Sequence, residues 1–458
     1  MNYQFKDMEK SLFDEKSVES LLKKRISIEN VTEKHFGTEV VVAGFVKRIK
    51  NLGDNLKFLI LSDHSGEIQL TFKSDIYKNI KVINELAPYT FIVAKGDATR
   101  GYSKKGREVV VKDFYVLGEV SAQPIPIEIE HIETSLDKRL DYRWIDLRNP
   151  KHRFPLVLLS EFTRYCREFF YKNDFVEIFS PKLIGMATES GAEVFTVPYF
   201  GKTAYLAQSP QFYKQMAICA GFEKVFEIAP VFRANPSFTT RHDTEFTSLD
   251  FEIGYVSSHY DVMSWEEKML NYAFRRLKEK WEEKVRNNFN QEINLPKKIP
   301  KIKMEEVYEI VDKKNIKEDG DITPEGEREV SEYIKKTYGN EFAFVIDFPY
   351  KARPFYHMKG NPMKDGTETT KSFDLLYRGI EITTGAQREH RYKVLVNQAK
   401  EKGLNIENLR YYLEFFKYGA PPMGGLGLSP TRVIMALTGA KNVREVTYLP
   451  RDPKRLFP

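Results

Sequence analysis

Short alternations of apolar and polar residues fill the region from residue 38 to residue 120. They predict strands, because successive side chains of a strand point to opposite faces. Five strands are expected, at 40–46, 58–61, 68–72, 91–94 and 109–111. The second and third flank Asp63-His64-Ser65-Gly66, a turn sequence. Five short strands within about 80 residues predict a small β-barrel.

A different pattern begins near residue 137. Phe154–Phe170 and Tyr260–Val285 carry apolar residues at helical spacing. Shorter apolar runs predict strands at 175–178, 225–228, 249–253 and 379–383. Strands and helices that do not alternate regularly favour an α+β fold, with an antiparallel sheet flanked by helices.

Four segments follow from these patterns. A chain of 458 residues is too long for one core. We expect a charged helical extension over 1–37, a barrel of the oligonucleotide-binding type (OB-fold) over 38–120, a proline-containing linker over 121–150 and a large domain over 151–458.

Composition adds little to this picture. Lys+Arg number 71 and Asp+Glu 65, and this mild excess permits a polyanionic partner without requiring one. Cys166 and Cys219 lie in apolar helical contexts and are expected to be buried thiols rather than a disulfide or metal site. The charged N-terminus has no apolar signal region, and no apolar run approaches the ~20 residues of a membrane span. A cytoplasmic protein without a membrane partner is expected.

The first candidate site combines cations with an aromatic ring. Arg233 follows a predicted strand, and Arg241 and His242 come after the turn sequence 235–237. A hairpin here would bring both arginines over one ligand, and guanidinium groups suit phosphate oxygens. Glu245 and Phe246 on the return strand offer a carboxylate for an exocyclic amine and a ring for stacking on a base. A surface hairpin with solvated arginines is the alternative.

A glycine-rich segment, Gly424–Arg432, is the second candidate. Its glycines would let the backbone approach a ligand, and Arg432 at the start of an apolar helix would reach a phosphate. Tight packing at a strand–helix junction is the alternative. The segment lacks the GxxxxGK[ST] pattern, which disfavours a P-loop enzyme.

A third group pairs carboxylates. Asp374 and Glu381 are expected on neighbouring antiparallel strands, with the Thr384 hydroxyl nearby. Such a set suits Mg²⁺, which takes one or two carboxylates together with substrate phosphates. Arg388 is a candidate partner for a substrate carboxylate. Exposed acids on an ordinary strand are the alternative.

The segment Gln208–Gln215 places an amide, a hydroxyl and an ammonium group close together. These groups suit a small amino acid that bears a carboxylate. The cationic loop after Phe232 would bind a nucleotide, and this nucleotide would activate the amino acid.

Together these segments resemble the class II aminoacyl-tRNA synthetases of subclass b, and in particular their aspartyl branch of the archaeal and eukaryotic type. Phe175–Pro181 resembles motif 1, which forms the homodimer interface of the family. Phe232–Glu252 resembles motif 2, and Gly424–Arg432 resembles motif 3. Three motifs in order behind an anticodon-type barrel carry the resemblance over most of the chain.

The resemblance implies a role for each matching residue. Arg233 and Arg432 would be the catalytic arginines on the α- and γ-phosphates of ATP, and Phe246 would stack on adenine. Further ATP contacts would come from Asn235, Arg241, His242, Asp243, Glu245, Glu381 and Ser429. Mg²⁺ would be bound by Asp374, Glu381 and Thr384. L-Aspartate would be bound by Glu189, Ser209, Gln211, Lys214, Asp250, Thr384 and Arg388.

In the barrel, Phe58 and Gln69 match the positions that stack on and recognise the central U of the anticodon. The implied partners are tRNA(Asp), ATP, L-aspartate and a second copy of the chain. The residues leave open whether tRNA(Asn) is also charged, and Lys47 and Arg48 do not decide it.

Lys214 favours aspartate over asparagine. Two cations facing one carboxylate would leave uncompensated charge if asparagine entered, a penalty of several kcal/mol. The chain departs from the family pattern at Asn235, where Glu is usual, at Met423, where His is common, and at Ser429-Pro430-Thr431, where Gly-x-Glu is usual.

Three other functions stay open on the sequence. An asparaginyl-tRNA synthetase shares the motifs. A non-catalytic RNA-binding paralogue is disfavoured by retention of Arg233, Glu381, Arg388 and Arg432. An ammonia-using asparagine synthetase of related fold would have no need of an anticodon-type barrel.

Overall fold

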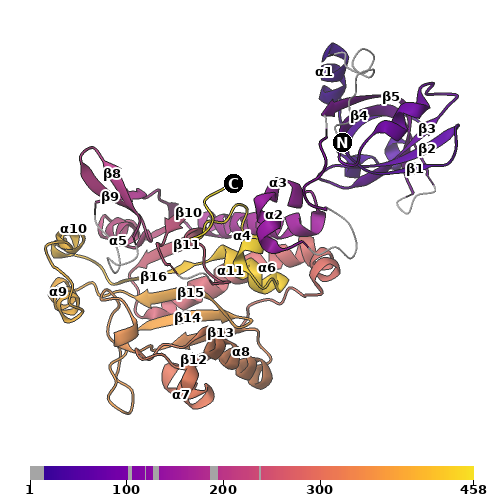
Figure 1. The fold of residues 1–458 in the computed structure, drawn as a ribbon. Helices are drawn as coiled ribbons and strands as arrows, with labels where there is room; N and C mark the ends of the chain where they lie inside the picture. Colours follow the sequence, from indigo (N-terminus) through magenta and orange to yellow (C-terminus); the bar gives the residue numbers. More distant parts are fainter. Residues whose placement is uncertain (1–14, 102–105, 119, 127–133, 186–193, 237–238) are drawn as a thin grey trace. The chain divides into compact units, whose positions relative to one another are not determined.

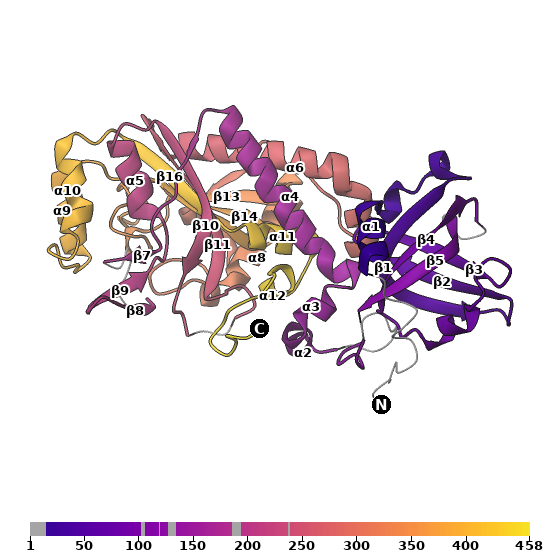
Figure 2. The same cartoon turned by 90° about the horizontal axis from the view of Figure 1, so that it is seen from above.

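The computed structural model describes residues 15–101, 106–118, 120–126, 134–185, 194–236 and 239–458. Glu189, one of the predicted substrate contacts, lies outside the described residues. The chain divides into two compact units, Met1–Pro126 and Ile127–Pro458 (Figures 1 and 2).

The first unit is a closed five-stranded barrel in the order β1-β2-β3-β5-β4. Its strands are β1 (Glu39–Asn51), β2 (Leu56–Ser62), β3 (Glu67–Lys73), β4 (Phe91–Thr99) and β5 (Glu108–Gly118). All five predicted strands are confirmed. In β2 every second residue is buried, so one face packs into the barrel and the other stays accessible.

The barrel strands are longer than the apolar pattern indicated. β1 continues beyond Val46 to Asn51, and its pairing with β2 shifts between Val46 and Arg48. Such a shift bends a strand and lets it continue around a barrel. The unit also contains α1 (Glu15–Lys23) and short 3-10 helices at Ile28–Asn30, Glu33–His35 and Ile80–Glu85.

The second unit is built on an eight-stranded sheet in the order β12-β13-β14-β15-β16-β11-β10-β6. The strands are β6 (Val176–Glu177), β10 (Lys224–Phe232), β11 (Glu245–Gly254), β12 (Lys301–Lys303), β13 (Phe342–Ile346), β14 (Ser372–Tyr377), β15 (Ile380–Gln387) and β16 (Met423–Leu428). The predicted antiparallel sheet is confirmed for the inner pairs. The outermost pairs, β12 with β13 and β6 with β10, are parallel.

Two long helices, α4 (Pro150–Lys172) and α6 (His259–Phe289), pack on each other and on the core side of the sheet (Figure 2). Both match predicted helical segments. A small sheet contains β7 (Leu183–Ile184), β8 (Thr196–Tyr199) and β9 (Lys202–Leu206). The other helices are α2 (Leu136–Asp141), α3 (Arg143–Asp146), α5 (Gln211–Cys219), α7 (Met304–Ile310), α8 (Pro324–Tyr338), α9 (Tyr392–Glu401), α10 (Arg410–Glu414), α11 (Pro430–Thr438) and α12 (Val443–Val446), with 3-10 turns at Lys313–Asn315, Tyr350–Ala352 and Phe415–Tyr418.

The segment predicted as a linker, 121–150, contains α2 and α3. The buried Arg143 side chain pairs with Asp146 and donates to the carbonyl oxygens of Glu445, Thr447 and Tyr448. Residues 136–146 are therefore anchored in the second unit by their own polar contacts.

Both cysteines are free thiols, with Cys166 buried and Cys219 partly buried. Among the described residues, no helix is both long and apolar enough to cross a bilayer.

Candidate active site

A cavity of about 450 Å³ lies over the central strands of the second unit, at the ends of β11, β15 and β16. It collects residues that are up to 235 positions apart in the chain, from Gln208 to Val443. Its walls include the following predicted residues: Ser209, Gln211, Arg233, Asn235, Arg241, His242, Asp243, Phe246, Asp250, Glu381, Thr384, Arg388, Ser429 and Arg432.

The β10–β11 hairpin and the start of α11 supply Arg233, Arg241 and Arg432 to this cavity. Arg233 directly follows β10, its N–H donates to the Thr244 carbonyl, and its guanidinium carbon lies 5.5 Å from the centre of the Phe246 ring. The Ser429 hydroxyl caps α11 by accepting from the Arg432 N–H. The Arg432 guanidinium then donates to the Glu381 carbonyl at 2.9 Å. The two segments therefore line one cavity.

His242 is a hydrogen-bonding group rather than a cation. Its Nε2 lies 2.9 Å from Arg432 Nη2 and its Nδ1 lies 2.7 Å from the Thr239 hydroxyl. Burial and the Arg432 charge lower the pKa of His242 to about 4. The positive charge of the loop at neutral pH therefore comes from its arginines.

The structure separates Glu245 from Phe246. Phe246, Ser248 and Asp250 line the cavity at alternate positions of β11. Glu245 precedes Phe246 on the same strand, so its side chain is on the opposite face, where it is exposed. Glu245 therefore does not line the cavity beside Phe246. Asp243 lines the cavity, but its Oδ2 accepts from the Thr447 hydroxyl.

Lys214 lies behind the cavity wall, within a buried group of four charges. Lys214 Nζ is 2.9 Å from Asp250 Oδ1 and 3.5 Å from Glu252 Oε2, and it donates to the Leu426 carbonyl at 2.7 Å. Arg388 binds both oxygens of Glu252, at 2.9 and 3.2 Å. We call Lys214, Asp250, Glu252 and Arg388 the charge quartet.

The charge quartet corrects the sequence argument. That argument counted two uncompensated cations, whereas the structure sets two buried carboxylates against them. Isolated charges are too costly to bury, and each cation of the charge quartet is held by a carboxylate. Glu252 was not predicted to take part.

Glycines of β16 make room for these carboxylates. Gly425 and Gly427 stand opposite Glu252 and Asp250 in the β11–β16 pairing. A Cβ at position 425 would lie 2.2 Å from Glu252 Oε2, and one at 427 would lie 3.1 Å from Asp250 Oδ1. The glycines of this segment therefore accommodate buried side chains, which is a more specific role than close approach to a ligand.

Polar atoms without partners face the cavity beside the charge quartet. His357 Nε2 lies 3.1 Å from Arg388 Nη1, and burial followed by the Arg388 charge lowers the pKa of His357 well below its usual value. In the described part of the chain, His357 Nδ1 and Gln211 Nε2 are buried with no hydrogen-bond partner. Such atoms indicate a ligand that would satisfy them.

The predicted carboxylates for Mg²⁺ lie on neighbouring strands. Asp374 pairs with Thr384 in the β14–β15 register, and the Thr384 hydroxyl donates to Glu381 Oε1 at 3.2 Å. Arg353 binds Asp374 Oδ2 at 2.6 Å, which the sequence did not indicate. Burial and the Glu381 carboxylate raise the pKa of Asp374.

The described residues fit a magnesium ion that shares its ligands with a substrate. They contain no cluster of three or more His, Cys, Asp or Glu side chains that would enclose a metal. Asp374 Oδ1 is buried and lacks a hydrogen-bond partner among them. One or two carboxylates with phosphate oxygens are the ligands that Mg²⁺ usually takes.

Sequence reasoning missed Glu252, Arg353 and His357. Arg353 and His357 flank Pro354-Phe355-Tyr356 on one short segment before β14. A cation, an imidazole and two rings within five residues was a detectable signal. The sequence around Glu252 gave no signal of a site residue, because an acid at the end of an apolar strand is usually exposed.

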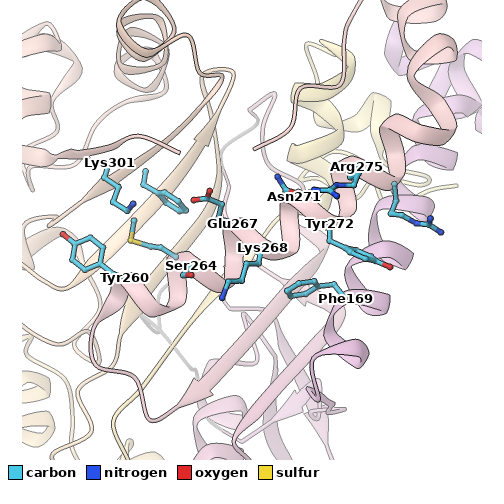
Figure 3. A pocket seen from close by; sticks show the side chains of 12 residues that line it. Phe169, Tyr260, Ser264, Glu267, Lys268, Asn271, Tyr272, Arg275 and Lys301 are labelled. Carbon is cyan, nitrogen blue, oxygen red and sulfur yellow. Dashed lines mark hydrogen bonds between the residues drawn. The ribbon is translucent and has the colours of Figure 1, made fainter. Parts of the chain in front are cut away.

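A second cavity, of about 710 Å³, runs along α6 (Figure 3). Phe169, Tyr260 and Tyr272 contribute rings, and Lys268, Arg275 and Lys301 contribute cations. It contains none of the predicted site residues. Although it is larger than the cavity over the sheet, it brings together no paired carboxylates or buried cations.

The predicted anticodon residues share one face of the barrel. Phe58 stands opposite Thr71 and Ile60 stands opposite Gln69 in the β2–β3 pairing, so Phe58 and Gln69 are diagonal neighbours. The Gln69 amide donates to Glu108 Oε2 at 2.7 Å, and the Thr71 hydroxyl donates to the same oxygen at 2.9 Å. Glu108 therefore fixes the orientation of the Gln69 amide.

Comparison with known families covers both units. Residues 135–453 match the family described as tRNA synthetases class II (D, K and N), and residues 40–117 match the OB-fold nucleic acid binding domain. The aspartate–tRNA(Asp/Asn) ligase of Aeropyrum pernix is 41% identical over 96% of this chain and 100% of its own length. The aspartate–tRNA(Asp) ligase of Pyrococcus abyssi is 41% identical over 93% of this chain and 98% of its own.

Solved structures of two specificities resemble the chain. The asparaginyl-tRNA synthetase of Pyrococcus horikoshii, complexed with asparaginyl-adenylate, has a TM-score of 0.87 and 28% identity, covering 95% of this chain and 99% of that one. The aspartyl-tRNA synthetase of Entamoeba histolytica has a TM-score of 0.83 and 29% identity, covering 95% and 93%. Both specificities share this backbone, so the choice of amino acid depends on side chains.

Proposed function

The chain belongs to the class II tRNA synthetases, in the group formed by the aspartate, lysine and asparagine enzymes, and from this premise we propose that it is an aspartate–tRNA ligase. As a member of this family it is an aminoacyl-tRNA synthetase, whose substrates are an amino acid, ATP and a tRNA. The choice of aspartate as the amino acid substrate is the more specific part of the proposal.

The charge quartet carries this proposal. Aspartate brings an ammonium group and a side-chain carboxylate into the cavity. Asp250 would turn from Lys214 to the ammonium group, and Lys214 with Arg388 would take the side-chain carboxylate. Every charge would keep a partner in the complex.

Asparagine would break this balance. It supplies the same ammonium group, so Lys214 would still lose part of its hold on Asp250, but the amide offers no negative charge in return. A buried group left with the wrong polar partner costs several kcal/mol, which corresponds to roughly 10⁴-fold discrimination. The names of the relatives from Aeropyrum and Pyrococcus support the same choice.

The proposed reaction begins with attack of the aspartate α-carboxylate on the α-phosphorus of ATP. Its oxygen forms the new bond, pyrophosphate leaves in line, and aspartyl-adenylate results. The terminal ribose hydroxyl of the tRNA then attacks the acyl carbon and AMP leaves. No side chain acts as a nucleophile, so positioning and charge stabilisation supply the catalysis.

Each part of the nucleotide has a proposed partner. Arg233 would bind the α-phosphate, Arg432 the γ-phosphate, and Phe246 would stack on adenine. The neighbourhood of Arg233 and Phe246 supports this, because one phosphate and its base would lie against both. Asp374, Glu381 and Thr384 would hold Mg²⁺, which when bound neutralises phosphate charge.

The tRNA partner is proposed to be tRNA(Asp), with tRNA(Asn) as a second substrate. Aromatic rings and oriented amides suit unpaired bases, and the half-buried Phe58 ring and the Gln69 amide lie on one barrel face. The relative from Aeropyrum is named for both tRNAs and that from Pyrococcus abyssi for one. Charging of tRNA is expected to place the enzyme in the cytoplasm.

A homodimer through the motif 1 region completes the proposal. The edge strand β6 and the segment after it expose Val176 at 45% and Phe179 at 85% of their surfaces. Apolar groups exposed together at a sheet edge favour association. Light scattering of the purified protein should give twice the chain mass.

Two assays test the function. ATP–pyrophosphate exchange should depend on aspartate, and exchange with asparagine alone would make the chain an asparaginyl enzyme, the specificity of the Pyrococcus horikoshii structure. Absence of exchange with any amino acid would support a non-catalytic RNA-binding protein. Charging of tRNA(Asp) and tRNA(Asn) transcripts with labelled aspartate decides the range of tRNA substrates.

A further inference from the structure

A carboxylate just outside the nucleotide cavity touches two of the elements that form it. Glu327 is buried in the first turns of α8, which packs against β13, β14 and β15 (Figure 1). Its Oε2 atom accepts from Arg241 Nη1 at 2.7 Å and from the Glu381 N–H at 2.9 Å. One oxygen therefore joins the β10–β11 loop to the start of β15.

The start of α8 is held firmly enough to position this carboxylate. Thr323 caps the helix by accepting from the Gly326 N–H at 3.3 Å, and Pro324 occupies its first turn. Gly326 packs so closely that an added Cβ would lie 3.1 to 3.2 Å from Val311, Asn315 and Ile322. Glu327 is the residue after Gly326, so the tight packing of Gly326 fixes the backbone from which the Glu327 side chain extends.

Arg241 needs such a partner because it borders two open spaces. One is the nucleotide cavity, and the other is a cavity of about 380 Å³ that Gln291, Arg378 and Lys441 also line. Besides Glu327, the Arg241 guanidinium bonds the Gly379 carbonyl at 3.0 Å. A long side chain that borders open space on both sides can leave the nucleotide cavity at a small cost in free energy, unless a charged acceptor holds it.

We propose that Glu327 is a positioning residue for ATP. It keeps the Arg241 guanidinium at the nucleotide cavity and in a fixed position relative to Glu381. Glu327 does not line the cavity, so it acts through Arg241 and the β15 strand. This inference rests on the proposed function, since it takes the cavity to be the ATP site and Glu381 to be a ligand of Mg²⁺.

The test compares Glu327→Ala, Glu327→Gln, Arg241→Ala and the Glu327→Ala/Arg241→Ala double variant. Glu325→Ala is the matched control, because Glu325 lies in the same turns of α8 but is exposed and pairs with Arg328. Calorimetric titration with ATP and Mg²⁺ gives the Kd for ATP, and thermal unfolding gives the midpoint of each variant.

Loss of a hydrogen bond to a charged group weakens an interaction about 10- to 100-fold, so Glu327→Ala should raise the ATP Kd by about 10-fold or more. Glu327→Gln keeps one acceptor oxygen and should raise it by only about 3-fold. The double variant should lose less ATP affinity than the sum of the two single losses, because part of the effect of Glu327 is exerted through Arg241. Glu325→Ala should match the wild type.

An ATP Kd for Glu327→Ala within about 2-fold of the wild type would overturn the proposal. So would fully additive losses in the double variant, or a loss of ATP affinity that is accompanied by a lower unfolding midpoint, since these indicate a merely structural residue. The titration contains no amino acid or tRNA. It therefore still decides the role of Glu327 if exchange assays show that the enzyme uses asparagine.

Discussion

Replacing Lys214 by Met tests whether the charge quartet is balanced as the structure indicates. Methionine keeps most of the length and apolar volume of lysine but removes its charge. The variant would lose the 2.9 Å contact with Asp250, the 3.5 Å contact with Glu252 and the 2.7 Å bond to the Leu426 carbonyl. Two buried carboxylates would then share one cation, Arg388.

Breaking a buried ion pair from one side typically destabilises a protein by about 3–5 kcal/mol. We expect a loss of this size in the free energy of unfolding, or a fall of roughly 6–20 °C in the midpoint at about 2–4 °C per kcal/mol. The aspartate KM should rise at least about 100-fold, corresponding to roughly 3 kcal/mol, because the substrate carboxylate loses a cation. The ATP KM should stay within about 2-fold of the wild type.

Urea unfolding followed by tryptophan fluorescence measures the loss in the correct unit, because Trp144, Trp265 and Trp281, the three tryptophans of the chain, all belong to the second unit. Lys224→Met is the matched control. Lys224 is partly buried, donates to the Asn173 carbonyl and lies near two aromatic rings, so a loss of about 1 kcal/mol is expected.

The Lys214→Met/Asp250→Asn double variant provides the sharper test of stability. Removing one carboxylate restores equal numbers of charges, so the double variant should recover more than half of the lost stability. A double variant less stable than Lys214→Met would refute the account of balanced charge. An unchanged aspartate KM in Lys214→Met would refute the proposed contact with the substrate.

Three further predictions concern other parts of the chain. Phe246→Ala should raise the ATP KM in pyrophosphate exchange by about 5- to 10-fold and leave the aspartate KM unchanged, since stacking contributes roughly 1–1.5 kcal/mol; equal rises in both would contradict a stacking role. Phe58→Ala should raise the tRNA KM about 5- to 100-fold with no change in exchange, because stacking on one base contributes about 1–3 kcal/mol; normal charging kinetics would exclude Phe58 from anticodon contact. His259 is buried, both its ring nitrogens lack hydrogen-bond partners, and burial followed by Lys371 lowers its pKa from 6.5 to about 4. Between these values the unfolded chain binds the extra proton, so the contribution of His259 to stability is complete above pH 6.5 and falls by up to about 3 kcal/mol as pH drops towards 4; urea midpoints of His259→Gln that keep the wild-type slope in this range would refute it.

Local patterns were sufficient for most secondary structure. The alternation in 40–46 and 68–72 predicted barrel strands because each has one buried face. The same rule, applied within β11, would have separated Glu245 from Phe246. The edge strand β12, with the single buried residue Ile302 among lysines, offered no such pattern and was not predicted.

The partners of buried charges could not be predicted in this way. Lys214 and Asp250 are 36 residues apart, and Arg388 and Glu252 are 136 apart. Composition shows that the chain contains these charges, but only the packing of α5, β11 and β15 decides which of them meet. Arg353 with Asp374 and Glu327 with Arg241 escaped sequence reasoning for the same reason.

The charge quartet also limits how this enzyme can evolve. A single substitution that removes the charge of Lys214, Asp250, Glu252 or Arg388 leaves an opposite charge buried without its partner, and Gly425 leaves no room for a new side chain beside Glu252. A change of amino-acid preference therefore requires at least two coordinated substitutions, with a poorly folding variant between them. Laboratory selections that begin from paired changes at these positions should reach new specificities that libraries of single substitutions do not contain.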